Sequence, residues 1–260
     1  MNKALFIFFL LPSLNTNAQV IDKDIPANAV KLMRVYPGFI TGYKNNKLYF
    51  KDGTALIYDD GIKNKSVEEL LNNPDVEDQF YFTYTKGKIP ATIAYKNDPG
   101  RIRNESFFKK LYGSSKNEVI KNLTEINWCP KLAGQKIMVS KLNGVDKAIQ
   151  KISNELDQLP ELKKYIINIG GTFSWRKISG TNRISMHSFG MTIDINTKFS
   201  NYWQWDSKRT DENVPLNYKN KIPQQIIDIF ENNGFIWGGK WYHYDTMHFE
   251  YRPEFLMVGK

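Results

Sequence analysis

The sequence predicts an α+β protein, because signals for short strands and patterns of amphipathic helices occupy different parts of the chain. Strand signals broken by turns dominate residues 37–100, whereas apolar residues at helical spacing begin after residue 100. The chain has 260 residues, of which 41% are hydrophobic and 24% charged. This composition is typical of a globular protein, and the length suffices for a sizeable core.

The first residues have the pattern of a secretory signal peptide. Met1-Asn2-Lys3 is a short positive start, Ala4 to Leu11 is an unbroken apolar run, and Ala18 follows a polar stretch. The run is shorter than the roughly 20 apolar residues that span a bilayer. We therefore expect residues 1–18 to be cleaved and the protein to be exported, periplasmic or extracellular, without a stable membrane anchor. A buried N-terminal helix is the alternative interpretation.

Residues 19–100 are predicted to form a β-rich N-terminal region, whose role the sequence does not indicate. Lys51-Asp52-Gly53-Thr54 separates two apolar runs, and Asp-Gly between such runs indicates a hairpin. The run Gln79–Tyr84 predicts a further strand.

Residues 101–260 carry the helical patterns. Apolar residues at positions 119, 123 and 126 share one helix face, and those at 145, 149, 152 and 156 predict a second amphipathic helix after an Asn-Gly turn. Tyr165–Ile169 reads as a strand that ends at two glycines. Pro223 is expected to open a helix over Gln224–Asn233, which Gly234 ends.

The formal net charge of +9 indicates affinity for anionic surfaces such as cell-wall polymers or lipid headgroups. The lysines are spread along the chain without a dense basic run, so we expect no nucleic-acid partner. Cys129 is the only cysteine, which excludes an internal disulfide. We expect it to be a small buried apolar residue.

The three histidines point to a metal site. His187 precedes Gly190, a residue that permits a sharp bend, and Asp194 follows on a strand whose isoleucines alternate with it. The histidine and the aspartate are therefore expected to converge. A neutral imidazole nitrogen and a carboxylate oxygen are both ligands that zinc accepts.

A second segment completes this site. His248 and Glu250 alternate with apolar residues on another predicted strand, and His248 would be the third ligand. Two imidazoles and one carboxylate, with water in the fourth position, are typical of a catalytic zinc. Asp245 is the candidate base for that water. A single histidine is usually a satisfied core or surface residue, so the indication comes from the joint pattern.

The two segments resemble the signatures of the zinc D-alanyl-D-alanine carboxypeptidase and L-alanyl-D-glutamate peptidase family, which cuts peptidoglycan stem peptides. The family patterns S-x-H-x-x-G-x-(A/T)-x-D and (D/E)-x-x-H are complete at Ser185–Asp194 and Asp245–His248. The resemblance implies Zn²⁺ on His187, Asp194 and His248, with Asp245 as general base. It also implies a small antiparallel sheet that carries the zinc site, flanked by helices.

Other candidate site residues surround these motifs. The resemblance assigns Arg176, in Ser-Trp-Arg, to stabilising the oxyanion, whereas a surface salt bridge is the alternative. Arg183 is a candidate for binding a substrate carboxylate. Ser185 is expected to orient a ligand or bind substrate, since no serine triad is evident. Trp241 is predicted to line the cleft, although a structural turn explains its segment equally well.

The ligand set and the general base do not include His243 or Glu250. His243 lies outside the family's ligand positions, and its role is not predicted. Glu250 shares the strand face of His248, so a hydrogen bond behind the metal is expected.

Together these features predict a zinc peptidase domain over residues 101–260 that acts on peptidoglycan or its peptide fragments. Carboxypeptidase and endopeptidase activities both remain open, and the oligomeric state is not predicted. One alternative is an inactive zinc-containing wall-binding module of the same fold. The other is a basic structural protein of the cell surface, which would need no such cluster.

Overall fold

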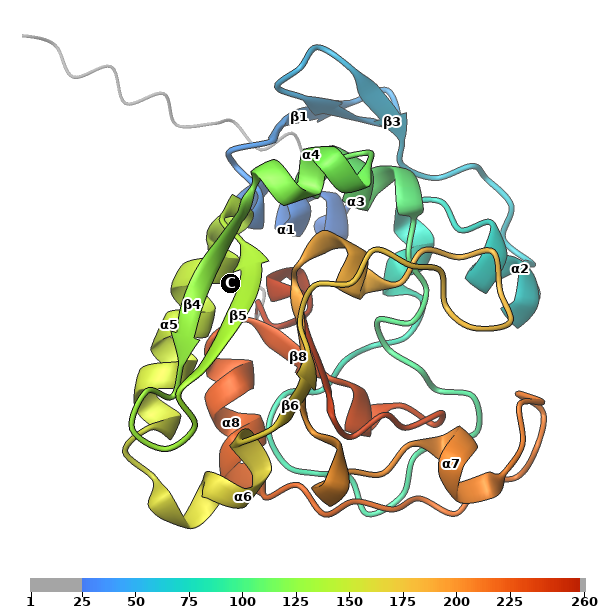
Figure 1. The fold of residues 1–260 in the computed structure, drawn as a ribbon. Helices are drawn as coiled ribbons and strands as arrows, with labels where there is room; N and C mark the ends of the chain where they lie inside the picture. The colour runs from blue at the N-terminus through green and yellow to red at the C-terminus, as the bar shows by residue number, and fades with distance from the viewer. Residues whose placement is uncertain (1–24, 258–260) are drawn as a thin grey trace, which may run out of the picture.

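The computed structural model describes residues 25–257, so the predicted signal peptide lies outside the described residues. Small antiparallel sheets flanked by helices make up this part of the chain, which confirms the predicted α+β class. Figure 1 shows the ribbon, with the N-terminal three-stranded sheet at one end of the molecule. Within residues 25–257, no helix combines the length and the apolar character needed to cross a membrane.

The N-terminal region begins with helix α1 (Ala27–Val35), followed by strands β1 (Ile40–Lys44), β2 (Lys47–Phe50) and β3 (Ala55–Ile57). The predicted hairpin is confirmed, because β2 and β3 pair antiparallel across the Asp-Gly turn. Helix α2 (Val67–Asn72) starts at a capping box, in which Ser66 and Glu69 bond each other's backbone N–H groups.

The strand predicted over Gln79–Tyr84 is wrong. Glu77–Phe80 forms the 3₁₀ helix η1 instead. The Asp75 carboxylate accepts a hydrogen bond from the Asp78 N–H at 2.8 Å, and the Asp78 carboxylate accepts one from the Asp75 N–H at 2.9 Å. These reciprocal bonds close a tight turn, which competes successfully with the strand preference of the aromatic residues that follow.

The next segment also differs from the prediction. After helices α3 (Glu105–Tyr112) and α4 (Lys116–Lys121), strands β4 (Leu123–Trp128) and β5 (Gln135–Ser140) form a hairpin. Positions 123 and 126 therefore lie on a strand and do not extend the helix face of Val119. Pairing along the whole of β4 satisfies the backbone groups that face β5, and Ile126 is buried in the core, which outweighs the helical spacing.

The helix predicted after the Asn-Gly turn is confirmed as α5 (Val145–Leu156), which packs against the β4–β5 hairpin. The strand predicted over Tyr165–Ile169 is largely wrong. The 3₁₀ helix η3 (Pro160–Leu162) leads into α6 (Lys163–Ile166), and strand β6 begins only at Ile169 and ends at Gly171. Pro160 fixes a helical start, and Asn168, at φ 51°, turns the chain into β6.

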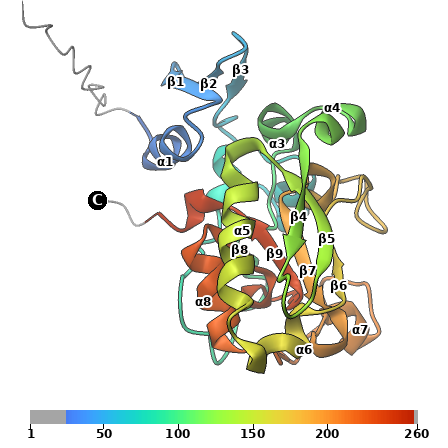
Figure 2. The same ribbon diagram turned by 60° about the vertical axis from the view of Figure 1, so that its left-hand side comes forward.

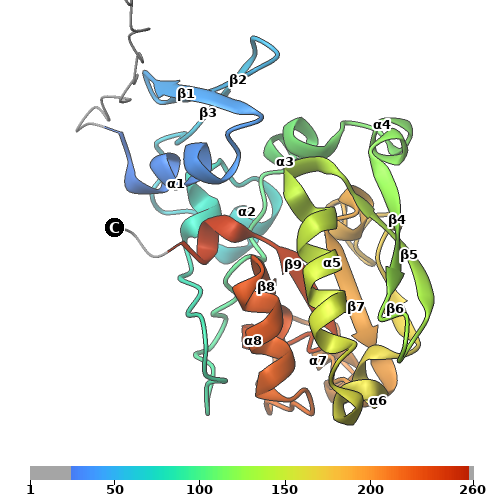
Figure 3. The same cartoon turned by 90° about the vertical axis from the view of Figure 1, so that its left-hand side faces the viewer.

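The four-stranded sheet has the order β6-β7-β9-β8, and all its neighbours are antiparallel. Its other strands are β7 (Thr192–Asn196), β8 (Phe235–Trp237) and β9 (His248–Tyr251). Helix α8 (Gln224–Asn232) starts after Pro223 as predicted and packs against β8 and α5, as Figures 2 and 3 show. The remaining elements are α7 (Trp203–Ser207) and the 3₁₀ turns η2 (Leu142–Gly144), η4 (Met186–Phe189), η5 (Thr197–Phe199), η6 (Gly238–Lys240) and η7 (Pro253–Phe255).

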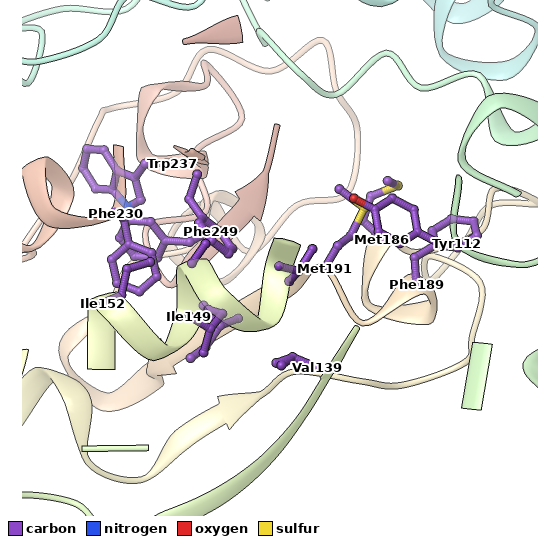
Figure 4. Packing of buried hydrophobic residues seen from close by; sticks show 14 of the residues in the cluster. Tyr112, Val139, Ile149, Ile152, Met186, Phe189, Met191, Phe230, Trp237 and Phe249 are labelled. Atoms are coloured by element: carbon purple, nitrogen blue, oxygen red, sulfur yellow. The ribbon is translucent and has the colours of Figure 1, made fainter. Parts of the chain in front are cut away.

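A continuous hydrophobic core joins the N-terminal region to the rest of the described chain. It runs from Leu32 on α1 through Ile149 on α5 to Phe249 on β9. Figure 4 shows Phe249 beside Phe230, and their rings stack at 3.9 Å between centroids. Cys129 lies in this core, so the expectation of a small buried apolar residue is confirmed, and burial raises the pKa of its thiol to about 12.

Candidate metal centre

Strands β7 and β9 bring two of the three predicted ligands together. Asp194 and His248 are direct cross-strand partners. Ile193 and Ile195 are fully buried on the core side of β7, so the alternation of the strand turns Asp194 to the opposite face, as the sequence predicts. The apolar half of each strand therefore fixes the direction in which its polar half points.

The turn before β7 supplies the third predicted ligand. His187 lies in η4, and Gly190 ends that turn at φ +64°. The Gly190 N–H donates to the His187 carbonyl at 3.1 Å. The positive φ favours glycine, and a Cβ at position 190 would lie 2.6 Å from Leu123 Cδ2 and 3.2 Å from the Ser140 backbone nitrogen, so a larger residue would have to displace Leu123.

The three side chains form a compact donor group. His187 Nε2 lies 3.2 Å from Asp194 Oδ2, and His248 Nδ1 lies 3.0 Å from Asp194 Oδ1. One donor atom from each residue lies within 4.8 Å of the other two. Ligand atoms about 2.0–2.1 Å from a tetrahedral zinc are about 3.3 Å apart, so these spacings suit that ion.

The donor chemistry also fits zinc. Two imidazole nitrogens and one carboxylate oxygen suit Zn²⁺, whereas Mg²⁺ and Ca²⁺ prefer oxygen ligands. A second acidic group, Asp59, Asp60 and Asp75, offers only oxygens, and Lys65 Nζ forms ion pairs with Asp60 at 2.6 Å and with Asp75 at 3.3 Å. Lys65, and Lys63 at Asp59, already form ion pairs with these carboxylates, so the histidine-containing group is the candidate metal centre.

Backbone and carboxylate acceptors orient both imidazoles. His187 Nδ1 lies 2.7 Å from the Thr172 carbonyl oxygen, which only accepts, so Nδ1 carries the proton and Nε2 is free for a metal. His248 Nε2 lies 3.3 Å from Glu250 Oε2, which leaves Nδ1 free in the same way. A metal ion that displaces the proton from the remaining nitrogen of each imidazole would therefore find both nitrogens on the side that faces Asp194.

Glu250 is itself held by two arginines. Its carboxylate accepts from Arg103 Nη2 at 2.6 Å and from Arg252 Nη1 at 3.0 Å, and its side chain is fully buried. Burial alone would raise the pKa of Glu250, but Arg103, His248 and Arg252 hold the pKa well below its usual value. The predicted hydrogen bond between His248 and Glu250 is therefore present, and the two arginines hold the Glu250 carboxylate in its charged form.

Asp245 lies on the loop before β9. Its N–H donates to the Gly238 carbonyl at 3.0 Å, and its own carbonyl accepts from the His248 N–H at 3.2 Å. A Cβ on Gly238 would lie 2.6 Å from the Asp245 carbonyl oxygen, so the glycine permits this approach. Burial, and then the Asp194 carboxylate, raise the pKa of Asp245 above its usual value. Its Oδ1 is buried without a hydrogen-bond partner in the described residues.

Arg176 and Ser185 lie next to the His187 turn. The Arg176 N–H donates to Ser188 Oγ, and its carbonyl accepts from the Ser185 N–H, both at 3.0 Å. The Arg176 side chain is exposed and Ser185 is buried. This placement is compatible with their predicted roles, which stay predictions.

Trp241 and His243 have contacts that the sequence did not indicate. Trp241 is buried, its ring centroid lies 5.6 Å from that of His248, and its indole N–H donates to the Pro99 carbonyl. The ring thus supports a candidate ligand, and contact with substrate stays a prediction. His243 Nδ1 lies 2.6 Å from Asp98, and its Nε2 lies 3.0 Å from the Glu212 carbonyl, so both nitrogens are occupied away from the metal centre.

Sequence reasoning missed the residues that support the ligands. The Thr172 carbonyl, Arg103 and Arg252 are contributed by segments far from the two motifs or outside their patterns. A backbone carbonyl leaves no signal in a sequence. Arg103 and Arg252 do not stand out among the other arginines of the sequence, and only the fold shows that they contact Glu250.

His187, Asp194 and His248 form a donor group that could hold a metal ion, and the unpaired carboxylate oxygen of Asp245 lies on the loop before β9. Residues 179–251 match a family described as D-alanyl-D-alanine carboxypeptidase, and this match confirms the resemblance predicted from the two motifs. The match supports a peptidase. It covers well under half of the chain, and it contains the three candidate ligands and Asp245 but begins after Arg176. No match was found among the curated proteins or the solved structures that were compared.

Proposed function

We propose that the protein is an exported zinc peptidase that hydrolyses peptide bonds in the stem peptides of peptidoglycan. The family match supports the peptidase and its substrate class. The observation that carries the zinc assignment is the convergence of His187, Asp194 and His248 within 4.8 Å. Export is supported by the signal-peptide pattern of residues 1–18.

His187, Asp194 and His248 would hold the zinc, which supplies Lewis acidity toward a carbonyl oxygen and toward water. Asp245 accepts the proton of the attacking water on its free Oδ1 and later delivers it to the leaving amine. Its raised pKa suits this exchange, because the carboxyl group can both take up and release a proton near neutral pH.

Arg176 is proposed to stabilise the negative charge that develops on the carbonyl oxygen of the scissile bond. Its support is the backbone contact between Arg176 and the turn that carries His187. The guanidinium is exposed and contacts the Lys177 carbonyl at 3.5 Å, so little holds it away from a bound substrate.

Digestion of purified peptidoglycan, with products read by mass spectrometry, tests the proposal. The zinc-loaded protein is compared with chelator-treated protein and with Asp245→Asn, which removes the base but keeps the side-chain volume. The exposed Asp211→Asn is the matched control. We expect products from the wild type and the control, and a loss of about 10²-fold or more in Asp245→Asn.

The nature of the products separates the two peptidase types. Free D-alanine that disappears with chelator and with Asp245→Asn indicates a carboxypeptidase. Shorter stem or cross-link peptides that disappear in the same way indicate an endopeptidase. A metal-loaded wild type that binds peptidoglycan from several sources without forming products would contradict the enzyme and support the wall-binding module.

A further inference from the structure

Arg183 lines two adjoining cavities outside the metal centre. The larger hollow has a volume of about 830 Å³ and the smaller one about 240 Å³, and they share Leu71, Asn72, Asn73, Glu105 and Arg183. The larger volume falls in the range of ligand sites, about 300–1,000 Å³.

A tight turn holds Arg183 in place. Lys177 and Ile184 form an antiparallel bridge, and the Ile178 N–H donates to the Arg183 carbonyl at 2.9 Å. The Arg183 N–H donates to Thr181 Oγ1 at 3.2 Å. The backbone is therefore fixed immediately before the Ser185–Asp194 motif, and the Arg183 side chain lines both cavities from this turn.

The Arg183 side chain lacks the carboxylate partners that its neighbours have. Arg101 pairs with Asp98 at 2.8 Å and with Glu212 at 2.7 Å, and Arg103 pairs with Glu250 at 2.6 Å. Within residues 25–257, no carboxylate lies within ion-pair distance of Arg183, and its buried Nε has no hydrogen-bond partner. Leaving a buried donor of a charged group unpaired is costly, which favours an anionic occupant.

The carboxylates that line the cavity do not pair with Arg183, so its guanidinium remains free for an anionic occupant. Two of the lining carboxylates are already paired, Glu105 with Lys109 at 2.6 Å and Glu212 with Arg101. Glu68 is an exposed lining residue at the rim. Burial, followed by the neighbouring Arg101 cation, lowers the pKa of Arg183, and Glu212 partly opposes this change.

The N-terminal region forms the opposite wall of this cavity. Leu71 and Asn72 of α2 line it, followed by Asn73. The wall is firmly docked, because Leu70 and Leu71 pack with Ile102 and the Asn104 amide donates to the Pro74 carbonyl at 2.7 Å. Residues far from the family-matched segment therefore complete the cavity on the side facing Arg183.

The cavity also connects with the metal centre through side chains. Met186, beside His187, and Arg103, the partner of Glu250, both line the smaller cavity. We propose that this cavity is a subsite that binds a carboxylate group of the substrate peptide on Arg183, with α2 as its far wall. The choice of a peptide carboxylate rests on the proposed function. This assignment gives the N-terminal region a role in substrate selection.

NMR of the Arg183 Nε–H tests the subsite without requiring turnover. Spectra of the zinc-loaded protein are recorded with N-acetyl-D-alanine and with its amide, which lacks only the negative charge. The signal is assigned by its loss in Arg183→Lys. We expect a saturable shift with the acid at millimolar concentration and none with the amide. No shift with the acid, or the same shift with the amide, would overturn the proposal.

The wall is tested with a variant that leaves Arg183 unchanged. Asn72→Trp places a large ring in the cavity, and the exposed Asn64→Trp is the matched control outside it. Because Asn72 is exposed, its replacement is expected to leave the fold intact. We expect Asn72→Trp to weaken binding of N-acetyl-D-alanine by about tenfold or more, and Asn64→Trp to leave it unchanged. Equal binding by all three proteins would exclude α2 as the wall.

Parallel digestion of peptidoglycan separates this proposal from the proposed function. Cleavage without a shift of the Arg183 signal would retain the peptidase and reject the subsite. A charge-dependent shift without cleavage would retain the carboxylate site and reject the peptidase.

Discussion

Glu250 is the residue through which a chain of buried charges reaches the candidate metal centre. It lies between His248 and Arg252, and Arg252 pairs with Glu254, which accepts a hydrogen bond from Tyr36 at 2.7 Å. Each of these side chains is buried, so its polar or charged group depends on the others for hydrogen bonds and for an opposite charge. A change at one position is therefore expected to act on both metal affinity and stability.

Replacing Glu250 with glutamine tests its support of His248. Glu250→Gln keeps the volume but removes the charge opposite Arg103 and Arg252. We expect zinc affinity to fall about 10- to 100-fold, because the imidazole loses its acceptor for Nε2–H or gains a weaker one. Competition with a zinc-binding dye measures the affinity. Glu155→Gln, an exposed position on α5, is the control, and equal affinity in the two variants would refute the role.

Asp98 makes a second buried charge arrangement, with Arg101 and His243. Burial alone would raise its pKa, but Arg101 and His243 lower the pKa to about 2. Because the folded-state pKa lies below the unfolded value of about 3.9, Asp98 stabilises the fold above about pH 4. This contribution is lost as the pH falls toward 2.

Asp98→Asn should therefore lower the free energy of unfolding by about 2 kcal/mol or more at pH 7. The difference from the wild type is expected to shrink as the pH falls from about 4 to about 2, because the wild-type carboxylate becomes protonated there. Urea unfolding across this pH range measures it. A difference that stays constant with pH would show that the charge of Asp98 is not responsible.

At the scale of secondary-structure elements, the η4 turn and strands β7 and β9 build the candidate metal centre. Their bounds and facing residues follow from alternation and from the glycine at position 190, which the sequence shows directly. Strand β4 could not be predicted in this way. Its apolar residues at 123 and 126 fit a helix equally well, and pairing with β5 decides the outcome.

The Gln79–Tyr84 segment illustrates a second limit of sequence reasoning. Its aromatic residues favour a strand, but carboxylate contacts from Asp75 and Asp78 close a turn first. The candidate metal ligands could be predicted because the chain has only three histidines, and two of them stand in two recognisable patterns. Arg103 was not, since its contact with Glu250 spans 147 positions of the chain.

Gly190→Ala and Gly180→Ala form a matched pair for the turn. Both glycines have a positive φ, +64° and +75°, but a Cβ meets Leu123 at 2.6 Å only at position 190 and finds nothing within 4 Å at position 180. We expect about 1 kcal/mol of destabilisation from the backbone angle at position 180. At position 190 the clash should add about 1–3 kcal/mol and weaken zinc binding.

Thermal unfolding and zinc competition measure both glycine variants. If Gly190→Ala binds zinc as tightly as Gly180→Ala and is equally stable, the packing of the turn does not position His187.

At the scale of the whole molecule, α1 belongs to the same core as the sheet that carries the site. Ala29 and Leu32 are fully buried in that core, and Tyr36 bonds Glu254 across it. The N-terminal region is thus expected to unfold together with the rest of the described chain. Joint unfolding would show that the N-terminal region is an integral part of the fold, whereas an appended module would unfold separately.

Tyr36→Phe tests this coupling. All six tryptophans lie at position 128 or later, so tryptophan fluorescence reports on the segment without α1. Removing the Tyr36 hydroxyl leaves Glu254 with one partner fewer, which should destabilise the protein by about 1–2 kcal/mol and lower the fluorescence midpoint. Tyr49→Phe, at an exposed position of β2, is the control. An unchanged midpoint in Tyr36→Phe would indicate independent unfolding of the two regions.

The metal content of the purified chain tests the central claim most directly. Zinc is quantified by mass spectrometry in the wild type and in His187→Ala, Asp194→Ala and His248→Ala, with His243→Ala as the control histidine. We predict about one zinc ion per chain in the wild type and in His243→Ala, and little in the three ligand variants. Full zinc occupancy in the ligand variants, or loss only in His243→Ala, would contradict the assignment of the metal centre.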